Sequence, residues 1–398
     1  MRTEIDRLAK ELEAKVVGWR RDLHENPELS NREFRTGELV AGHLHALGME
    51  VRTGVAGTGV VAILHGGKKG PAVALRADMD ALPVTERTGA PYASKTPGVM
   101  HACGHDCHTA MLMGAAEVLS RLRDTLEGRV TFLFQPAEEG LPGEEESGAR
   151  LMIKEGALED PVPDAIFGLH VGRFSKGVFF YRIGNFMASG DLLHMAVKGV
   201  QTHGALPWQG IDPVVIASQV ILGLQSIVSR QTDLTETPVV ISIGRISGGE
   251  RFNIVPQEVE MTGTIRVIDS GVRETVLEKV RTTAECIAKS GGATAEVIIK
   301  QMFAVTRNDP ALSARMLPTL QHIAGSEAVV EHPLMTTSED FSFYQEKIPG
   351  FFFFMNVAPP GGEVIPLHSP FFDVDEKALM TGVRAMSHLA VDFLQGSP

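Results

Sequence analysis

The sequence predicts an α/β protein whose mostly parallel sheet is interrupted by an inserted α+β domain of ferredoxin-like type. Three observations support this fold class. The chain has 398 residues, more than one hydrophobic core usually organises, so two domains are expected. Short apolar runs alternate with helical segments in the outer parts of the chain. Between about residues 185 and 300, the expected order of elements changes to β-α-β-β-α-β.

Short runs of apolar and β-branched residues predict the strands of the main sheet. These runs cover residues 73–76, 130–134, 165–169 and 351–357, and helices are expected over 109–122 and 375–394. Continuous apolar runs are typical of strands that helices cover on both faces. We therefore expect residues 1–184 and 301–398 to form one main domain.

Residues 185–300 form the expected insert. Its strands are predicted over 192–200, 238–246, 258–267 and 295–300, and its helices over 212–229 and 272–290. This order is that of a ferredoxin-like unit, which folds around a core of its own. The insert is therefore expected to be a compact second domain.

Composition limits the partners and the compartment. The formal charge of −12 argues against nucleic acid or an anionic membrane as the main partner. Residues 1–17 are polar and lack the apolar core of a signal peptide, and no run reaches the ~20 apolar residues that span a bilayer. Three cysteines with no framework spacing favour a reducing compartment. We expect a cytoplasmic protein.

Side chains that can bind a ligand follow three of the predicted strands. Asp78 and Asp80 follow the first, Glu138 and Glu139 follow the second, and His170 follows the third. In an open α/β sheet, ligands bind beyond the carboxyl ends of the strands, so these groups are expected to meet in one crevice. The acidic pair would suit a hydrolytic metal site, because one carboxylate can bind metal while its neighbour acts as a base. A solvated acidic loop is the alternative for this pair.

The segment from His101 to His108 predicts a metal site. Five nitrogen or sulfur side chains fall within eight positions, namely His101, Cys103, His105, Cys107 and His108. The two cysteines lack the C-x-x-C spacing of a disulfide oxidoreductase. A buried cysteine beside ordinary surface histidines is the alternative. The run 144–146, three glutamates, is expected to be a solvated loop.

Five motifs in register resemble the amidohydrolase branch of the metal-dependent aminoacylase and carboxypeptidase family. This branch includes hippurate hydrolases, N-acyl-amino-acid amidohydrolases and the plant hydrolases of indole-acetyl-amino-acid conjugates. The likeness runs from about residue 20 to residue 368 in the family's order. The motifs lie at residues 76–83, 100–106, 135–140, 168–170 and 367–370.

The resemblance implies roles for individual residues of the main domain. The positions that match the family's metal ligands are Cys103, His105, Glu139, His170 and His368. Glu138 matches the catalytic base, and Asp80 matches a carboxylate that orients a ligand. His101 and His108 are expected to support the site or pack beside it.

The metal is expected to be zinc, manganese, cobalt or nickel, with one or two ions per subunit. The wider family has His-x-Asp at the exit of the first strand, whereas this chain has Asp78-Met79-Asp80. That departure matches the amidohydrolase branch and leaves the number of tightly bound ions open.

In the insert, the resemblance implies a lid and dimerisation domain. His203 lies in a segment that is similar to the family's lid motif, in which a histidine reaches the site of a partner subunit and stabilises the developing oxyanion. A homodimer or homotetramer is therefore implied. Asn253 and Arg266 match residues that hold the free carboxylate of the substrate.

Together these roles imply the hydrolysis of an N-acyl amino acid to a carboxylic acid and a free amino acid. Metal would polarise the amide carbonyl and acidify water, and Glu138 would pass the proton of that water to the leaving nitrogen. A dipeptidase or carboxypeptidase of the same family is one alternative. A non-catalytic metal-binding or ligand-binding protein is another, but such a protein does not need the base Glu138.

Overall fold

The computed structural model describes residues 1–140, 146–359 and 361–396, so most of the acidic run 144–146 lies outside the described residues. The chain divides into two compact units. Unit 1 comprises Met1–Gly184, Arg307–Pro333 and Phe343–Pro398, and unit 2 comprises Asn185–Thr306 and Leu334–Ser342. The segment Leu334–Ser342 was expected in the main domain. It groups with unit 2 because Ala188 N donates to the carbonyls of Met335 and Thr337, each at 3.0 Å.

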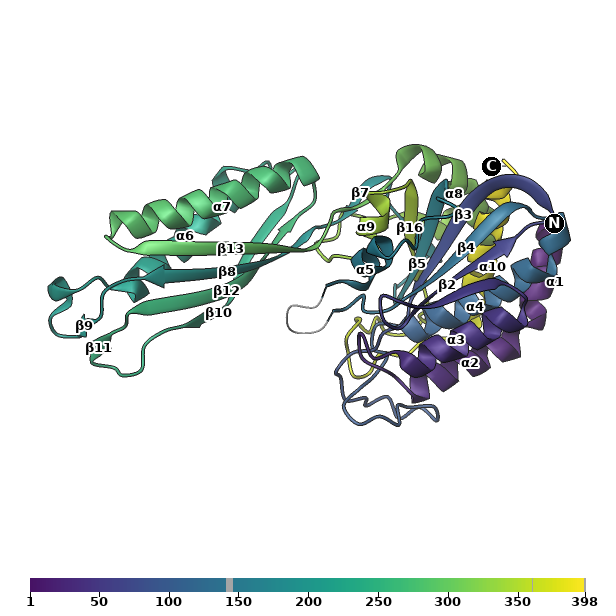
Figure 1. Ribbon diagram of the computed structural model, residues 1–398, viewed down its shortest axis with the longest axis horizontal. Coiled ribbons are helices and arrows are strands. Elements are labelled where there is room, and N and C mark those ends of the chain that lie inside the picture. The colour runs from purple at the N-terminus through teal and green to yellow at the C-terminus, as the bar shows by residue number, and fades with distance from the viewer. Residues whose placement is uncertain (141–145, 360, 397–398) are drawn as a thin grey trace. The chain divides into compact units, whose positions relative to one another are not determined.

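Unit 1 contains a mixed sheet, eight-stranded within the described residues, in the order β1-β2-β4-β3-β5-β16-β6-β15 (Figure 1). The strands are β1 (Glu50–Val55), β2 (Gly59–His65), β3 (Lys68–Asp78), β4 (Glu127–Gln135), β5 (Ala165–Gly172), β6 (Phe179–Tyr181), β15 (Val329–Glu331) and β16 (Gly350–Asn356). The four central strands β4, β3, β5 and β16 run parallel, which confirms the predicted fold class. The edge strands β1 and β2 are antiparallel.

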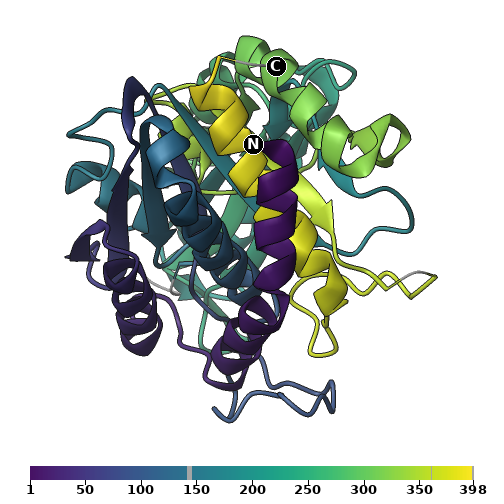
Figure 2. The same cartoon turned by 90° about the vertical axis from the view of Figure 1, so that its right-hand side faces the viewer.

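The helices of unit 1 pack against this sheet and against one another. They are α1 (Arg2–Glu11), α2 (Glu13–Glu25), α3 (Phe34–Ala46), α4 (His105–Arg121), α5 (Gly148–Lys154), α8 (Pro310–Ala324), α9 (Ser342–Gln345) and α10 (Leu379–Leu394). The helix α4 contacts β3, α2 and α10, so nearly all of its residues are buried. At the two ends of the chain, α1 and α10 lie side by side (Figure 2), and Arg2 Nη2 lies 2.7 Å from Asp392 Oδ2.

The helix α4 begins four residues earlier than predicted. Gly104 caps its N-terminus with φ of 87°, in the left-handed region that favours glycine. A Cβ atom at this position would lie 2.3 Å from Val171 Cγ2, so no larger residue fits without a shift in β5. The tight approach turns the chain directly into the helix and makes His105 its first residue.

Unit 2 is an antiparallel sheet in the order β10-β12-β8-β13, covered on one face by α6 and α7 (Figure 1). Its main elements are β8 (Gly190–Lys198), α6 (Pro213–Arg230), β10 (Val239–Ser247), β12 (Glu258–Val267), α7 (Ser270–Ser290) and β13 (Thr294–Phe303). The chain order and the strand order are those of a ferredoxin-like unit, as predicted. By length and composition alone α6 could cross a membrane, but its buried residues pack in the core of unit 2.

Four short strands complete the described fold. They are β7 (Gly184–Met187), β9 (Thr202–His203), β11 (Ile254–Val255) and β14 (Thr306–Asn308). The strands β9 and β11 pair with each other, with Ile254 opposite His203. This pair stands at the end of unit 2 at which β12 begins (Figure 1). We call this end, residues 199–211 and 248–257, the tip of unit 2.

Candidate metal centre

The five residues expected to bind metal converge beyond the carboxyl ends of the parallel strands. They come from the loop before α4, the first turn of α4, the loop after β4, strand β5 and the loop after β16. In each of three groups, the potential ligand atoms lie within 4.8 Å of one another. The groups are Cys103, His105 and His170; Cys103, Glu139 and His368; and His105, Glu138 and Glu139.

His170 presents one ring nitrogen as an acceptor. Its Nδ1 lies 2.7 Å from the carbonyl oxygen of Val171, which can only accept, so Nδ1 carries the hydrogen. The Nε2 atom therefore keeps its lone pair, and it lies 3.4 Å from Cys103 Sγ. Burial holds the pKa of His170 well below its usual value. The neutral imidazole is the form that binds metal.

His105 has a buried ring nitrogen without a hydrogen-bond partner. Its Nδ1 lies 3.0 Å from Asp80 Oδ1, whereas Nε2 is buried without a hydrogen bond to a described residue and lies 3.8 Å from Asp78 Oδ2. An unpaired buried nitrogen is costly, and a metal ion at Nε2 would satisfy it. Burial opposes a positive charge on His105, but the Asp78 and Asp80 carboxylates outweigh burial and raise its pKa to about 10. The same negative field favours a bound cation.

Cys103 needs a cation in order to ionise. Burial raises the pKa of its thiol well above the usual value, and the nearby Glu139 and Glu138 carboxylates add to this effect. A divalent ion bound at Cys103 would lower the pKa of this thiol, because a coordinated thiol loses its proton. Thiolate, imidazole and carboxylate together form a donor set that suits zinc, manganese, cobalt or nickel. The residues present therefore fit a divalent metal.

His368 reaches the centre from a loop far along the chain. Its backbone N–H donates to the Ala102 carbonyl at 2.8 Å, which holds it beside the loop of Cys103. Its φ of 65° lies in the left-handed region, which non-glycine residues rarely occupy. Its Nε2 lies 3.0 Å from Glu139 Oε1, and the hydrogen bond that this carboxylate accepts raises the pKa of His368.

Asp80 links two of the candidate ligands. Its Oδ1 faces His105, and its Oδ2 accepts hydrogen bonds from Ser30 Oγ at 2.6 Å and from the backbone N–H of Glu139 at 3.0 Å. One carboxylate thus orients the His105 ring and the loop that carries Glu139. This is the geometry of a group that supports metal ligands rather than of a ligand itself.

The two other histidines of the motif are placed differently. His108 uses both ring nitrogens, because Nε2 accepts from Val171 N at 2.8 Å and Nδ1 lies 2.5 Å from Asp78 Oδ1. It has no lone pair left for a metal. His101 is buried with both nitrogens unpaired within the described residues, and burial lowers its pKa to about 4. It belongs to none of the candidate ligand groups found there.

A buried charged cluster behind the centre was not identified from the sequence. Asp106, which follows His105, accepts from Arg20 Nε at 2.9 Å and lies 2.7 Å from His24 Nδ1. Arg20 and His24 are one turn apart on α2, and this spacing was the available signal. The cluster fixes the start of α4, from which His105 projects.

In unit 2, His203 exposes a hydrogen-bond donor. The backbone N–H of Ala205 donates to His203 Nδ1 at 3.1 Å, so the ring hydrogen lies on Nε2. The ring is exposed at the tip. Arg266 lies in β12, half-buried, and its side chain makes no hydrogen bond or salt bridge to any described residue. Burial lowers its pKa.

Asn253 and Arg266 do not come together within one chain. Asn253 stands in the turn before β11 at the tip, whereas Arg266 is close to the opposite end of β12. The eight residue-to-residue steps from Glu258 to Arg266 span about 26 Å when extended. One substrate carboxylate therefore cannot contact both side chains of a single chain. Their joint role in binding a carboxylate stays a prediction, because most of β12 lies between them in one chain.

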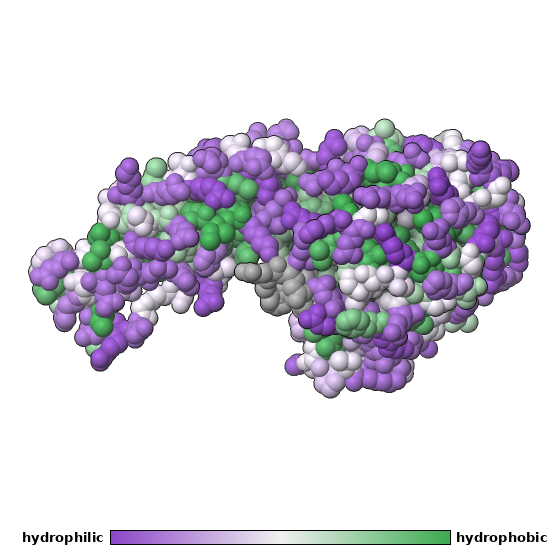
Figure 3. All heavy atoms as spheres, viewed as in Figure 1, coloured by the Kyte–Doolittle hydropathy of each residue, from purple (hydrophilic) through white to green (hydrophobic). Residues whose placement is uncertain are grey.

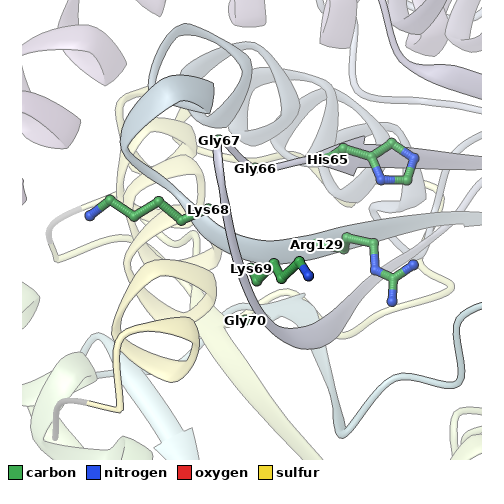
Figure 4. A pocket seen from close by; sticks show the side chains of 8 residues that line it. His65, Gly66, Gly67, Lys68, Lys69, Gly70 and Arg129 are labelled. Carbon is green, nitrogen blue, oxygen red and sulfur yellow. The ribbon is translucent and has the colours of Figure 1, made fainter.

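A cavity of about 500 Å³ lies at the other end of the main sheet and takes no part in the metal centre. It is lined by His65, Gly66, Gly67, Lys68, Lys69, Gly70, Gly128 and Arg129. Figure 4 shows Lys68 pointing away from Lys69 and Arg129. These residues lie where β3 and β4 begin, whereas the candidate ligands lie beyond the ends of these strands.

Comparison with known proteins identifies the family. Residues 74–392 match the sequence profile of peptidase family M20/M25/M40. The chain belongs to this family. An M20/M25/M40 relative, thermostable carboxypeptidase 2 of Saccharolobus solfataricus, is 41% identical over 390 residues, which are 96% of each chain. The N-acetyl-L-cysteine deacetylase of Bacillus subtilis is 39% identical and covers 93% of this chain and 86% of its own.

A solved structure supports the same assignment. A dinuclear metal-binding peptidase of the M20 family from Bacillus subtilis superposes with a TM-score of 0.81 at 36% identity, covering 97% of this chain and 99% of its own. The protein is thus an M20-family metal-dependent hydrolase of amide or peptide bonds.

Proposed function

We propose that the protein hydrolyses N-acyl amino acids to a carboxylic acid and a free amino acid, as an aminoacylase of the hippurate hydrolase type. The observation that carries the chemistry is the position of Glu138, whose carboxylate lies within 4.8 Å of ligand atoms of both His105 and Glu139. A base beside the ligands is what amide hydrolysis needs. The likeness to a deacetylase of N-acetyl-L-cysteine supports the substrate class.

The residues divide the work of the reaction. A divalent cation held by the candidate ligands would polarise the amide carbonyl and make a neighbouring water more acidic. Glu138 accepts the proton of the attacking water and delivers it to the leaving nitrogen, so that the amide C–N bond breaks and a free amine leaves. Asp80 keeps His105 and the Glu139 loop in place. The expected ligands are Cys103, His105, Glu139, His170 and His368.

Substrate recognition uses residues of unit 2. The unpaired guanidinium of Arg266 suits the free carboxylate of the amino acid, which it can bind through two hydrogen bonds. The Nε2–H of His203 suits the oxyanion that develops on the amide carbonyl. Since β12 extends about 26 Å from Glu258 to Arg266 and lies between Asn253 and Arg266 in one chain, a site that uses both residues takes them from two chains. A homodimer, alone or within a homotetramer, follows from this proposal.

The free carboxylate of the substrate's amino acid gives a direct test of the substrate class. The metal-loaded protein should cleave an N-acyl amino acid about 10- to 100-fold faster in kcat/KM than its amide or methyl ester. Arg266→Ala should remove most of this preference by slowing the acid and sparing the amide. Arg245→Ala, which alters an exposed arginine in β10, is the matched control and should keep the preference. Equal rates on acid and amide with the unmodified protein would overturn the proposal.

A carboxypeptidase or dipeptidase is the second candidate, because a carboxypeptidase is among the similar relatives. The same assay separates the two. N-benzoyl and N-acetyl amino acids are compared with dipeptides that share the amino acid but carry a free α-amino group. Faster cleavage of the dipeptides would favour the second candidate over the first.

Sharing of sites between chains is tested by mixing two inactive variants. One chain carries Glu138→Gln and the other His203→Ala. In a mixed dimer, one site has both groups intact, so an equal mixture should recover about a quarter of the full activity. Neither variant alone should recover. If dimers verified as mixed stay inactive, His203 does not serve the partner's site.

A further inference from the structure

The tip of unit 2 exposes large apolar side chains. The Phe252 side chain is 98% exposed and that of Trp208 is 75% exposed, and Ile254 is also exposed. Hydrophobic atoms are visible on the surface of this tip among hydrophilic ones (Figure 3). Several large apolar side chains exposed together are informative, because such patches mark sites where a protein partner or a ligand binds.

The backbone of Phe252 is held beside His203 and Asn253, two residues of the proposed site. Phe252 and Asn253 are the central residues of a turn that Ile254 N closes by donating to Arg251 O at 3.2 Å. Gly204 N donates to Asn253 O at 2.8 Å, and a Cβ on Gly204 would lie 3.0 Å from the Asn253 backbone. His203 precedes this close contact. A site that receives His203 and Asn253 therefore also receives Phe252.

We propose that Phe252 enters the substrate site of a second copy of this chain and forms an apolar wall against the side chain of the substrate's amino acid. This inference rests on the proposed function, in which Asn253 binds the carboxylate of that amino acid. The carboxylate and the side chain are attached to the same carbon, and neighbouring Cα atoms are about 3.8 Å apart. Phe252 thus lies within reach of the side chain when Asn253 holds the carboxylate.

The occupant that covers Phe252 is a second copy because the proposed site needs two chains. Asn253 lies in the turn before β11 and Arg266 near the far end of β12, so the two can meet at one substrate only when they come from different chains. The consequence is a preference among amino acids. Substrates with an apolar side chain gain a contact with the ring that a glycine derivative lacks.

Two substrates with the same acyl group isolate this contact. N-benzoyl-leucine and N-benzoyl-glycine differ only in the side chain of the amino acid. Phe252→Ala should lower kcat/KM about tenfold for the leucine derivative and leave the glycine derivative within about twofold. Phe252→Leu should restore most of the loss. Leu222→Ala, which removes another exposed apolar side chain on α6, should leave the ratio of the two substrates unchanged.

Mixed dimers show which chain supplies the ring. In a mixture of Glu138→Gln and His203→Ala chains, the single intact site receives its tip from the Glu138→Gln chain. Phe252→Ala placed in that chain should slow the leucine derivative about tenfold, whereas the same change in the His203→Ala chain should have no effect. Equal effects from the two placements would overturn the assignment to a partner's site.

Other outcomes also decide the proposal. If Phe252→Ala slows both substrates equally and dimers dissociate in sedimentation, Phe252 is a packing contact and the proposal is wrong. The proposal is also wrong if Phe252→Ala changes the rate for neither substrate, or if the unmodified protein does not prefer the leucine derivative. Failure of the proposed function looks different, because the unmodified protein would then cleave neither substrate.

Discussion

Cys103 and Cys107 are four residues apart and both buried, yet they have different surroundings. Cys103 Sγ lies 3.4 Å from His170 Nε2 and belongs to two of the candidate ligand groups. Cys107 packs in the hydrophobic core of unit 1 and belongs to none of the candidate groups found in the described residues. Replacing each with alanine therefore separates metal binding from packing, with the two variants as controls for each other.

The expected magnitudes are distinct. Removing even a residue that only supports a ligand costs 10- to 100-fold in metal affinity, so Cys103→Ala should weaken binding about 100-fold or more. At saturating metal, a 100-fold weaker affinity lowers the stabilisation that metal provides by about 2.7 kcal/mol. Cys107→Ala leaves a small cavity and should cost on the order of 1 kcal/mol, equally with and without metal.

Two measurements decide between these outcomes. Metal affinity is determined by competition with a coloured chelator, and unfolding is followed by heating the protein with and without added metal. Cys103→Ala should lose affinity and most of the metal-dependent rise in the thermal midpoint. Cys107→Ala should keep both while unfolding slightly earlier. Full metal affinity in the Cys103 variant, or its loss in the Cys107 variant, would refute the assignment of the thiolate ligand.

Three further predictions follow from the same site. Glu138→Gln should retain metal and lower kcat by at least about 100-fold, whereas Glu139→Gln should lose metal; turnover and metal content on both variants check this, and the reverse pattern would mean that the two roles are exchanged. Asp80→Ala removes the carboxylate that holds the His105 ring and should weaken metal affinity about 10- to 100-fold in the chelator competition. An unchanged affinity would contradict a role for Asp80 in orienting His105. Burial opposes a charge on His24, but Asp106 outweighs burial and raises the pKa of His24 from 6.5 to about 9. The stabilisation that the protonated His24 provides is therefore fully present below pH 6.5 and is lost as the pH rises through 9. The difference in thermal midpoint between the unmodified protein and His24→Asn should therefore shrink over that pH range, and a constant difference would count against the charged pair.

The sequence alone determined the parts of this protein that local patterns encode. The central strands of unit 1 are buried on both faces, so they read as unbroken apolar runs, and the ferredoxin-like order of unit 2 follows from the spacing of its elements. Strand ends and one compact motif pointed to groups of possible ligands, and the resemblance to a known family selected five residues among them. Parallel strands end at one edge of the sheet, which brings such residues together.

Tertiary structure decided what local patterns do not contain. The edge strand β1 is largely exposed and polar, so periodicity did not reveal it. His101 and His108 look alike in the sequence, and only the hydrogen bonds that His108 accepts from Val171 N and donates to Asp78 show that it has no free nitrogen. Asn253 and Arg266 match neighbouring motifs, yet most of the extended strand β12 lies between them. Contacts between distant segments depend on how whole elements pack, and no short stretch of sequence records that packing.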